Sequence, residues 1–428
     1  MITNNEPKEK NSLLNVLSLR DFRLLFAGVA TSLLGDQFTL IATPWLVLQL
    51  TDDPVVLGIV LALEGIPRAL FMLLGGAITD RFSPRMIMLA SDIARLILAG
   101  LMTVVVFTGI VQLWMLYAFA LGFGLVSGFA VPAGNSIVPM VVKEKDLQAG
   151  NSIVMGVGQL AGFVGPVMAG ILIGKYADSF WGIGFAFGID ALTYAVSAVM
   201  LGLMRNGRNR SALANTPDKE TIWDAIVTGL KYVWYDDVLR LMFLVIAAVN
   251  FLFVGPILVG IPVLADQRLA EGAMAFGLLM SGFAGGNLAG FLVAGLLPRP
   301  DGKAMRQLLL ALLTLFGCVL GLMGFINSTW VDFGLMLLLG LGNGYVTIIL
   351  FTSIQARTPK KMLGRIMSLL MLSSAGLVPV SQALSGVVIN WNLTSLFVLA
   401  GGLIVLVTFW TAFQPALDDF SESVLENA

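Results

Sequence analysis

The sequence predicts an all-α polytopic membrane protein in which twelve transmembrane helices form two pseudo-symmetric six-helix bundles. Three observations predict this fold: the composition, the spacing of the apolar stretches and an internal repeat. Of the 428 residues, 57% are hydrophobic and 12% are charged, whereas a soluble protein carries about 25% charged residues. With 25 basic against 26 acidic residues, the chain also lacks the basic surplus of a nucleic-acid binder.

The sequence has one cysteine and no histidine, which limits the metal sites and catalytic groups that the chain can form. The single cysteine, Cys318, allows no disulfide framework and no cysteine-built metal site. Without any histidine, the chain lacks the commonest metal ligand and the commonest general base. A phosphate-binding loop is missing too, since six residues separate Gly295 from Gly302 and Ala304 follows Lys303. We therefore expect neither an enzyme nor a bound metal or cofactor.

The apolar stretches set the number of membrane spans. A helix needs about 20 mostly apolar residues to cross a bilayer, and the chain contains six such stretches, a polar interval and six more. They lie near residues 22–50, 55–78, 86–110, 113–140, 152–174, 181–204, 239–265, 274–297, 305–326, 331–356, 366–389 and 393–413. We therefore predict an N-terminal bundle (1–204), a linker (205–238), a C-terminal bundle (239–413) and an acidic tail (414–428).

The positions of the basic residues predict the orientation. An even number of spans places both termini on one side, and cytoplasmic loops are enriched in Lys and Arg. The terminal segments, the central interval and the loops on that same side carry all but four of the 25 Lys and Arg residues. Of those four, Lys175 and Arg268 lie on the opposite side, and Arg68 and Arg95 lie within spans. Both termini and the linker are therefore expected to be cytoplasmic.

The two halves repeat each other at a nearly constant offset. Gly58 matches Gly277 at a separation of 219 residues, and the segment LGFG at 121–124 matches LGLG at 339–342 at a separation of 218. Two unrelated six-helix domains would not keep one offset over so long a stretch. The repeat is parallel, and six plus six spans in parallel is the architecture of the major facilitator superfamily.

Between the halves, the sequence predicts one amphipathic helix. Ile222, Ile226, Leu230 and Val233 recur at helical spacing. Such a helix is expected to lie on the inner membrane face and to tie the halves together. The acidic C-terminal tail is expected to be a solvated end.

The loop after the second span carries a recognisable motif. Residues 76–85 read GAITDRFSPR, which resembles the superfamily's cytoplasmic gate motif G-x-x-x-D-R-x-G-R-R, although Ser-Pro replaces the usual Gly-Arg. The matching positions are Gly76, Asp80, Arg81 and Arg85. The resemblance implies contacts that close the inner face and break when it opens. A loop that only follows the positive-inside rule would explain the arginines, but not an Asp at that spacing.

Further segments narrow the resemblance. Residues 161–170 read AGFVGPVMAG and resemble the exporter motif G-x-x-x-G-P-x-x-G-G at Gly165, Pro166 and Gly170, with Ala at two Gly positions. Small residues with a proline allow a kinked helix to pack closely against its neighbour in the other half. Together with LRDFR at 19–23 and LGRIMS at 363–368, the chain resembles the third drug:proton antiporter family, which includes macrolide efflux proteins and the enterobactin exporter. The resemblance implies a bacterial cytoplasmic-membrane protein.

Ionisable residues within the spans are hypotheses for function, because each costs about 2.5–3.5 kcal/mol to insert. Asp36 lies 14 residues from either end of the first span, about 21 Å along the helix and so near the membrane midplane. Glu64 lies similarly deep, and Arg68 follows it by one helical turn.

We hypothesise that Asp36 and Glu64 face a central cavity and that at least one binds and releases a coupling proton, since the chain has no histidine. The alternatives are a hydrogen bond to a neighbouring helix for Asp36 and a permanent ion pair with Arg68 for Glu64. Asp190 is expected to be a polar contact between helices. Asp92 and Arg95 are expected either to pair or to join the gate.

Uncharged polar residues within the spans are candidates for lining the substrate cavity. They are Gln37, Gln159, Asn250, Asn287 and Asn343. The 20 Met and 27 Phe residues suit an adaptable apolar cavity. The expected partners are an amphiphilic small molecule, protons and membrane lipids, and the chain is expected to act as a monomer.

The leading functional hypothesis is secondary active efflux of amphiphilic compounds such as drugs, macrolides or siderophores. In this hypothesis, proton antiport drives transport and the two halves rock around a midplane site. The alternatives are a lipid or lysolipid flippase and a non-transporting sensor built on a transporter scaffold. A sensor would bind ligand without flux.

Overall fold

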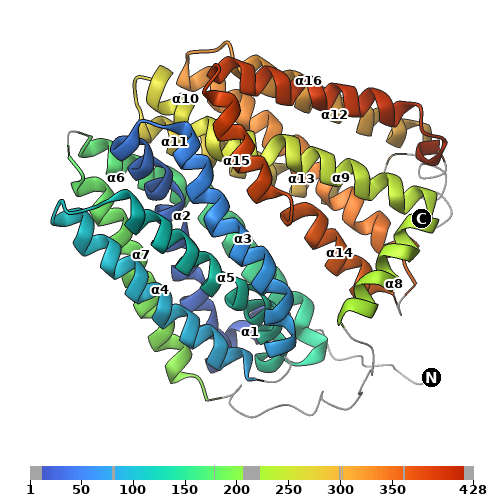
Figure 1. Cartoon of the computed structure of the whole chain (residues 1–428). Coiled ribbons are helices and arrows are strands. Elements are labelled where there is room, and N and C mark those ends of the chain that lie inside the picture. The colour runs from blue at the N-terminus through green and yellow to red at the C-terminus, as the bar shows by residue number, and fades with distance from the viewer. Residues whose placement is uncertain are drawn as a thin grey trace, which may run out of the picture.

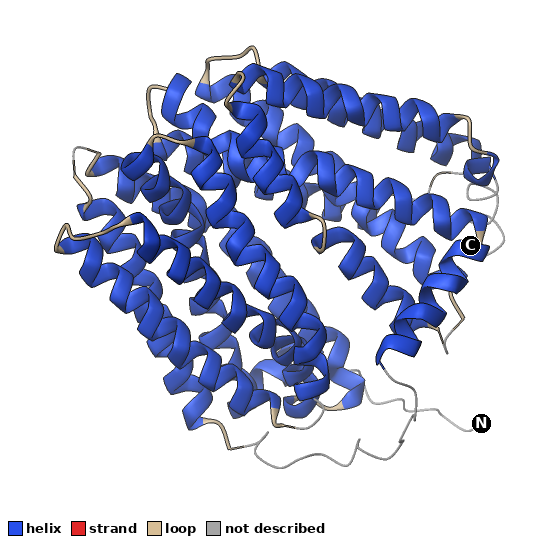
Figure 2. Cartoon of the chain, viewed as in Figure 1, coloured by secondary structure: helices blue, strands red, loops and turns tan. Residues whose placement is uncertain are grey.

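The computed structural model describes residues 12–79, 82–177, 179–205, 222–297, 300, 302–359 and 362–418. Helices make up nearly all of this described part of the chain, and it contains no strand (Figure 2). The predicted all-α class is therefore confirmed.

The helices of the first half agree with the predicted spans. They are α1 (Ser12–Ser18), α2 (Arg20–Thr51), α3 (Pro54–Thr79), α4 (Pro84–Phe107), α5 (Leu113–Val141), the short 3₁₀ turn η1 (Glu144–Asp146), α6 (Leu147–Lys175) and α7 (Trp181–Leu203). Asp52 ends α2 in the left-handed conformation, with φ of 51°, and its backbone N–H donates to the carbonyl oxygen of Leu48. This cap lets the chain turn directly into α3.

The second half repeats this order after the linker helix. Its elements are α8 (Ile222–Tyr235), α9 (Asp237–Gly255), the π turn η2 (Pro256–Gly260), α10 (Ile261–Arg268), α11 (Ala273–Leu296), α12 (Gly302–Met323), α13 (Thr329–Arg357), α14 (Leu363–Ala375), α15 (Val378–Ile389) and α16 (Leu393–Ala412). Asp236 caps α9 by accepting from the backbone N–H groups of Val238 and Leu239.

Two spans of the second half are interrupted. The predicted span at 239–265 loosens at Pro256, which has no N–H to donate, and continues as η2 and α10. The predicted single span at 366–389 is two helices, α14 and α15, because Pro379 lies in the first turn of α15 and limits the backbone before it. Among the described residues, eleven helices are long and apolar enough to cross a membrane. The α14–α15 pair supplies the twelfth span.

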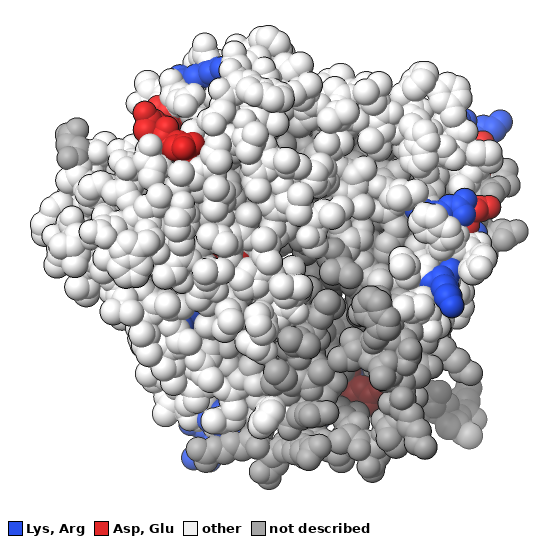
Figure 3. Space-filling view, viewed as in Figure 1, with Lys and Arg blue, Asp and Glu red and all other residues white. Residues whose placement is uncertain are grey.

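The two bundles approach at one end and diverge at the other. In Figure 1 the first half (blue to green) and the second half (yellow to red) meet where α10 and α15 lie and separate toward α8. We call the end that carries α8 and the starts of α2 and α4 the linker end, and the opposite end the distal end. On the face in Figure 3, charged side chains gather mainly at these ends, with a broad uncharged band between them. Such a band suits a hydrocarbon environment.

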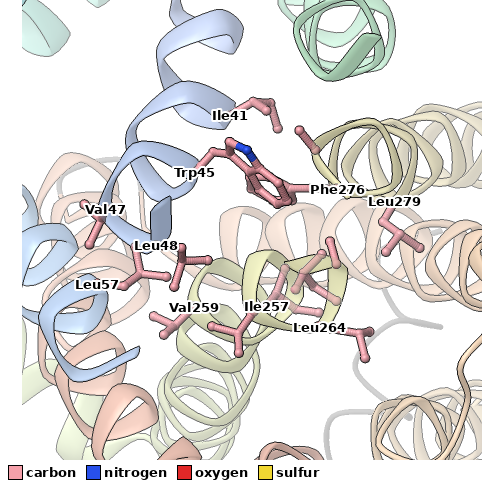
Figure 4. Close-up of a cluster of buried hydrophobic side chains, with 14 of the residues drawn as sticks. Ile41, Trp45, Val47, Leu48, Leu57, Ile257, Val259, Leu264, Phe276 and Leu279 are labelled. Atoms are coloured by element: carbon pink, nitrogen blue, oxygen red, sulfur yellow. The ribbon is translucent and has the colours of Figure 1, made fainter. Parts of the chain in front are cut away.

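A continuous apolar cluster joins the halves at the distal end. Trp45 and Ile41 of α2 lie close to Phe276 of α11, and further apolar residues from both halves surround them (Figure 4). The other labelled members are Val47, Leu48, Leu57, Ile257, Val259, Leu264 and Leu279. Two polar contacts accompany the cluster: Gln49 donates to Asp266 at 3.3 Å, and the backbone N–H of Val167 donates to Ser281 at 3.0 Å.

Glycines allow the backbones of the two halves to touch at this end. A Cβ on Gly277 of α11 would lie 2.3 Å from the carbonyl oxygen of Pro166 in α6. A Cβ on Gly58 of α3 would lie 2.6 Å from the carbonyl oxygen of Gln382 in α15. Because any side chain at these positions would meet rigid backbone, the distal contact depends on their being glycine.

The linker helix and the tail pack on the second half. The predicted amphipathic helix is α8, which lies against α9 and α14 and buries Val233. On its other side Leu230 and Trp234 are exposed. Asp418 belongs to the tail expected to be solvated, and it forms an ion pair with Arg306 of α12 at 3.2 Å.

The close contact at Gly277 can be tested directly. Gly277→Val should open the distal end, because the added side chain collides with the α6 backbone at a cost of about 1–3 kcal/mol. Spin labels at Ala177→Cys and Ala270→Cys, both exposed at the distal end, should report longer distances in a Cys318→Ser background. Gly402→Val is the matched control, since a Cβ there meets nothing within 4 Å. Unchanged distances in Gly277→Val would contradict the proposed importance of this contact.

Candidate functional site

A cavity of about 260 Å³, with both charged and apolar residues in its wall, lies within the first half. Four of its lining residues are charged: Asp36 on α2, Glu64 and Arg68 on α3, and Arg95 on α4. Its other lining residues are Gln37, Thr39, Leu40, Thr43, Pro44, Leu61, Phe123, Ser127 and Val131. The structure thus brings the three predicted proton-coupling candidates and Gln37 to one cavity, together with Arg95.

Asp36 is held by a neighbouring helix. Tyr194 of α7, which is 0% exposed, donates its hydroxyl hydrogen bond to Asp36. The helices come close enough because residue 35 is glycine. A Cβ there would lie 1.9 Å from the Thr193 hydroxyl oxygen and 2.6 Å from Oδ1 of Asp190. The hydrogen bond to a neighbouring helix, one of the two predicted readings of Asp36, is present, and the carboxyl group also lines the cavity.

A second hydrogen bond crosses the same two helices in the opposite sense. Thr39 of α2 donates to Oδ2 of Asp190 on α7. Asp190 is 0% exposed, and it is also the polar contact between helices that the sequence suggests. On each helix the two groups are three or four residues apart, so they lie on one face. The result is a reciprocal pair in which each helix supplies one acid and one hydroxyl.

Arg95 does not pair with Asp92, which was one of the two roles expected for these residues. Asp92 accepts instead from the hydroxyl of Ser197 at 2.6 Å, and Arg95 donates to Ser127 at 3.1 Å. The guanidinium carbon lies 5.5 Å from the ring centres of both Phe123 and Tyr194, within the range of cation–π attraction. Among the described residues, Arg95 forms no ion pair within 4.0 Å.

Glu64 and Arg68 form an ion pair along α3, with 3.7 Å between Oε1 and Nη1. Their side chains are 25% and 43% exposed, so the pair stands at the cavity wall rather than in a dry interior. A paired carboxylate in this position can hold the arginine at the cavity edge, as the alternative reading of Glu64 expects.

The second half builds the same helix contact without charge. In the first half, Gly124 and Gly128 of α5 approach the carbonyl oxygens of Glu64 and Arg68; in the second, Gly340 and Gly344 of α13 approach those of Phe283 and Asn287. By their packing, residues of α5 correspond to residues of α13 that lie 216 positions later in the chain. The sequence match instead indicates an offset of 218. Phe283 and Asn287 stand where the first half has Glu64 and Arg68.

The remaining cavity candidates lie outside the lining of this cavity. Asn343 donates to Asn287 at 2.9 Å, an amide pair between α13 and α11. Asn250 donates to the carbonyl oxygen of Ile246 in its own helix at 2.9 Å. Gln159 lies on α6 and is partly buried. Of the five predicted residues, only Gln37 is among the residues that line the cavity.

The gate motif is partly outside the described residues. Asp80 and Arg81 fall in the gap, and Gly76 belongs to the last part of α3. Arg85 is 2% exposed and donates to the carbonyl oxygens of Leu201 and Gly202 at 2.7 and 2.9 Å. It thereby binds the end of α7, where the free carbonyls of a helix favour a cation.

The exporter-like motif in α6 serves two interfaces. A Cβ on Gly165 would lie 2.5 Å from Cβ of Gln37, so this residue admits α2 of the same half. Gly170 instead faces the other half, where a Cβ would lie 2.6 Å from the carbonyl oxygen of Ala273. Pro166 contacts α11 through its carbonyl oxygen, which a Cβ on Gly277 would approach to 2.3 Å. Close packing with the other half, expected of the whole motif, is thus made by Pro166 and Gly170, and Gly165 packs within its own half.

The sequence did not single out the hydroxyl groups of the site. Thr39, Ser127, Tyr194 and Ser197 each bind a charged residue. The available signal was spacing: Tyr194 follows Asp190 by four residues and Thr39 follows Asp36 by three. Polar residues one turn from a buried acid are candidates for the same helix face.

Two six-helix halves, joined at one end and parted at the other, with a cavity that holds charged residues in the first half, define a multi-pass membrane protein that works as a secondary transporter rather than as an enzyme. The family model described as Major Facilitator Superfamily matches residues 25–381. The chain belongs to this superfamily.

Relatives and solved structures agree with this assignment. The chain is 27% identical to the multidrug efflux pump Tap of Mycolicibacterium fortuitum over 232 residues, which is 52% of this chain and 54% of the relative. It is 23% identical to macrolide efflux protein A of Streptococcus pyogenes over 184 residues, 43% and 44% of the two chains. These matches span about half the length of each relative.

A crystal structure of a mutant of the nucleoside transporter NupG superposes with a TM-score of 0.73 at 10% identity. The superposition covers 94% of this chain and 100% of that one. At this identity the likeness shows the fold alone.

The Glu64–Arg68 pair makes a testable prediction. Arg68→Met should lower the unfolding free energy by about 1–3 kcal/mol, a value between those for exposed and buried pairs, because Glu64 loses its partner. The double variant Glu64→Gln/Arg68→Met should regain most of this loss, since neither charge is left alone. Thermal unfolding in detergent measures both. A double variant as unstable as Arg68→Met would show that the pair is not what stabilises this part of α3.

Proposed function

We propose that this protein is a proton-coupled exporter of amphiphilic small molecules that works by alternating access. The observation that carries the proposal is Asp36, a carboxyl group at the middle of α2 that lines the cavity and is bound by Tyr194. A group that faces both a cavity and a hydrogen-bond network can exchange a proton with whichever side the cavity opens to. The names of the relatives, a multidrug efflux pump and a macrolide efflux protein, support export.

The cavity suits an amphiphilic substrate. Its wall combines charged groups with the apolar side chains of Leu40, Leu61, Phe123 and Val131. A compound with a polar head and an apolar body can satisfy both, and apolar walls tolerate varied shapes. In the second half, α11 and α15, which pack against the first half, carry no charged residue, so ionic selection at this interface falls to the first half.

Alternating access requires the distal contacts to break. In the present arrangement the halves touch through glycine backbones and the Trp45–Phe276 cluster, and they diverge at the linker end. If the linker end is cytoplasmic, as the basic residues predict, this is the inward-facing arrangement. Rocking of one half against the other would close the linker end and expose the same cavity to the outside.

Asp36→Asn should abolish proton-driven transport. The amide keeps the hydrogen bond from Tyr194 but cannot bind and release a proton, so uphill flux of ethidium or erythromycin into proteoliposomes under a pH gradient should fall at least tenfold. Exchange without a gradient should persist. The control is Asp332→Asn, a fully buried acid of the second half (0% exposed).

Full gradient-driven flux in Asp36→Asn would exclude this residue from coupling. Equal movement with and without the gradient in the wild type would contradict antiport and point to a facilitator. Wild-type movement of a fluorescent lysophospholipid in place of the drugs would identify a flippase.

The proposed orientation places α8 and both termini in the cytoplasm. A membrane-impermeant maleimide should label Ala177→Cys, exposed at the distal end, in intact cells of a Cys318→Ser variant. Lys145→Cys, exposed at the linker end, should react only after the cells are permeabilised. The opposite labelling pattern would invert the orientation and, with it, the direction of transport.

A further inference from the structure

We infer that Asp190 is a second proton-binding residue of the transport cycle and that Thr39 connects it to the cavity. The inference rests on the proposed proton-coupled function and extends it to a residue that lines no part of the cavity. Its basis is the geometry of the α2–α7 contact together with the charge balance of the buried groups around it.

The charge balance requires more than one proton. Three carboxyl groups, Asp36, Asp92 and Asp190, face one cation, Arg95. Glu64 and Arg68 neutralise each other nearby. Buried charges persist only when they are paired, so the group of three acids and one arginine is neutral when it holds two protons. Asp36 alone accounts for one of them.

The geometry favours Asp190 over Asp92 for the second proton. Oδ1 of Asp190 would lie 2.6 Å from a Cβ on residue 35, the neighbour of Asp36 in the chain. Asp36 and Asp190 belong to the same reciprocal hydrogen-bonded contact between α2 and α7, so the charge of one acts on the other. Asp92 is bound by Ser197 of α7 and forms no hydrogen bond with α2 among the described residues.

Thr39 supplies the route by which a proton moves between the cavity and Asp190. Its side chain lines the cavity and donates to Oδ2 of Asp190. A proton can reach Asp190 when the Thr39 hydroxyl passes its own hydrogen to the carboxylate while it accepts another from a hydronium ion in the cavity, which is left as water. The hydroxyl is unchanged at the end, one O–H bond forms on Asp190, and reversal of the step releases the proton.

Charged or titratable groups lie on α2 and α4, which pack against α7, and on α7 itself; α6, which also contacts α7, has its charged residue, Lys175, in its last turn. Asp36 lies on α2, Arg95 and Asp92 lie on α4, and Tyr194 lies on α7 itself. Tyr194 donates its hydrogen bond to Asp36, and Arg95 contacts Ser127 and two aromatic rings. Thr39 is therefore the group that joins Asp190 to the cavity.

The test is the proton-to-substrate ratio. With the membrane potential clamped at zero, each coupled proton sustains about a tenfold ethidium gradient per pH unit. Loss of one of two protons in Asp190→Asn should therefore lower the sustained gradient about tenfold per pH unit. Thr39→Val should do the same, because it keeps the side-chain shape and removes the hydroxyl. Thr39→Ser, which restores a hydroxyl, and Asp332→Asn should match the wild type.

The outcomes separate this inference from the proposed function. A wild type that sustains no gradient refutes the proposed function itself. A coupled wild type with unchanged ratios in Asp190→Asn and Thr39→Val overturns the inference and leaves the function standing. A folded Asp190→Asn that also loses gradient-independent exchange shows a structural role and likewise overturns it. If Asp190→Asn is not recovered folded, the comparison of Thr39→Val with Thr39→Ser decides, and equal gradients in the two refute the relay.

Discussion

The first half of the structure depends most on one constraint: an acid buried between its helices needs a hydrogen-bond donor. Three acids of the first half each meet a hydroxyl group, Asp36 from Tyr194, Asp190 from Thr39 and Asp92 from Ser197. A hydroxyl satisfies a carboxyl group in either protonation state, because it both donates and accepts. An arginine in the same place would favour only the charged form. Hydroxyl partners therefore allow a proton to come and go without breaking the packing.

This constraint also explains the glycines around the acids. Short hydroxyl side chains reach across a helix interface only where the helices nearly touch, and Gly35 gives α2 and α7 that proximity. The same device recurs between α3 and α5 and between α11 and α13. The second half has the same close helix contact but no charged pair, because Phe283 and Asn287 stand in place of Glu64 and Arg68. One half can thus carry the ionic chemistry while the other supplies an equivalent, uncharged wall.

Much of the fold was predictable from the sequence because membrane spans follow directly from apolar length. The confirmed fold class rests on that signal, whereas the linker helix was predicted from the helical spacing of Ile222, Ile226, Leu230 and Val233 and is present as α8. The break between α14 and α15 was missed, since one proline near the middle of an apolar stretch can either kink a helix or divide it. The register between α5 and α13 was misjudged by two residues, because short glycine repeats align equally well at several offsets.

The candidate site was predictable only in part, for a physical reason. Charged residues in a span stand out by their insertion cost, so Asp36, Glu64 and Arg68 could be named, and all three line one cavity. The direction in which a side chain points depends on helix rotation, which composition does not reveal. Arg95 could as well have paired with Asp92 three residues earlier; instead it turns toward Phe123, Tyr194 and Ser127. Hydroxyl residues such as Thr39 carry only the weak signal of their spacing from an acid, because they are common in spans and usually bond their own helix.

The distal contact is built so that it can also come apart. A transporter needs two arrangements of similar free energy, and an interface that is too favourable would hold one of them permanently. Here the halves meet through backbone and apolar side chains, with the Gln49–Asp266 and Val167–Ser281 hydrogen bonds added. In the same interface Gln382 is 3% exposed, and its Oε1 has no hydrogen-bond partner among the described residues. An unsatisfied buried amide costs free energy in the closed state, and that cost is relieved when water enters. The contact that seals the cavity thus contains a group that favours its opening, whereas the hydroxyl-bonded acids behind it stay satisfied in both arrangements.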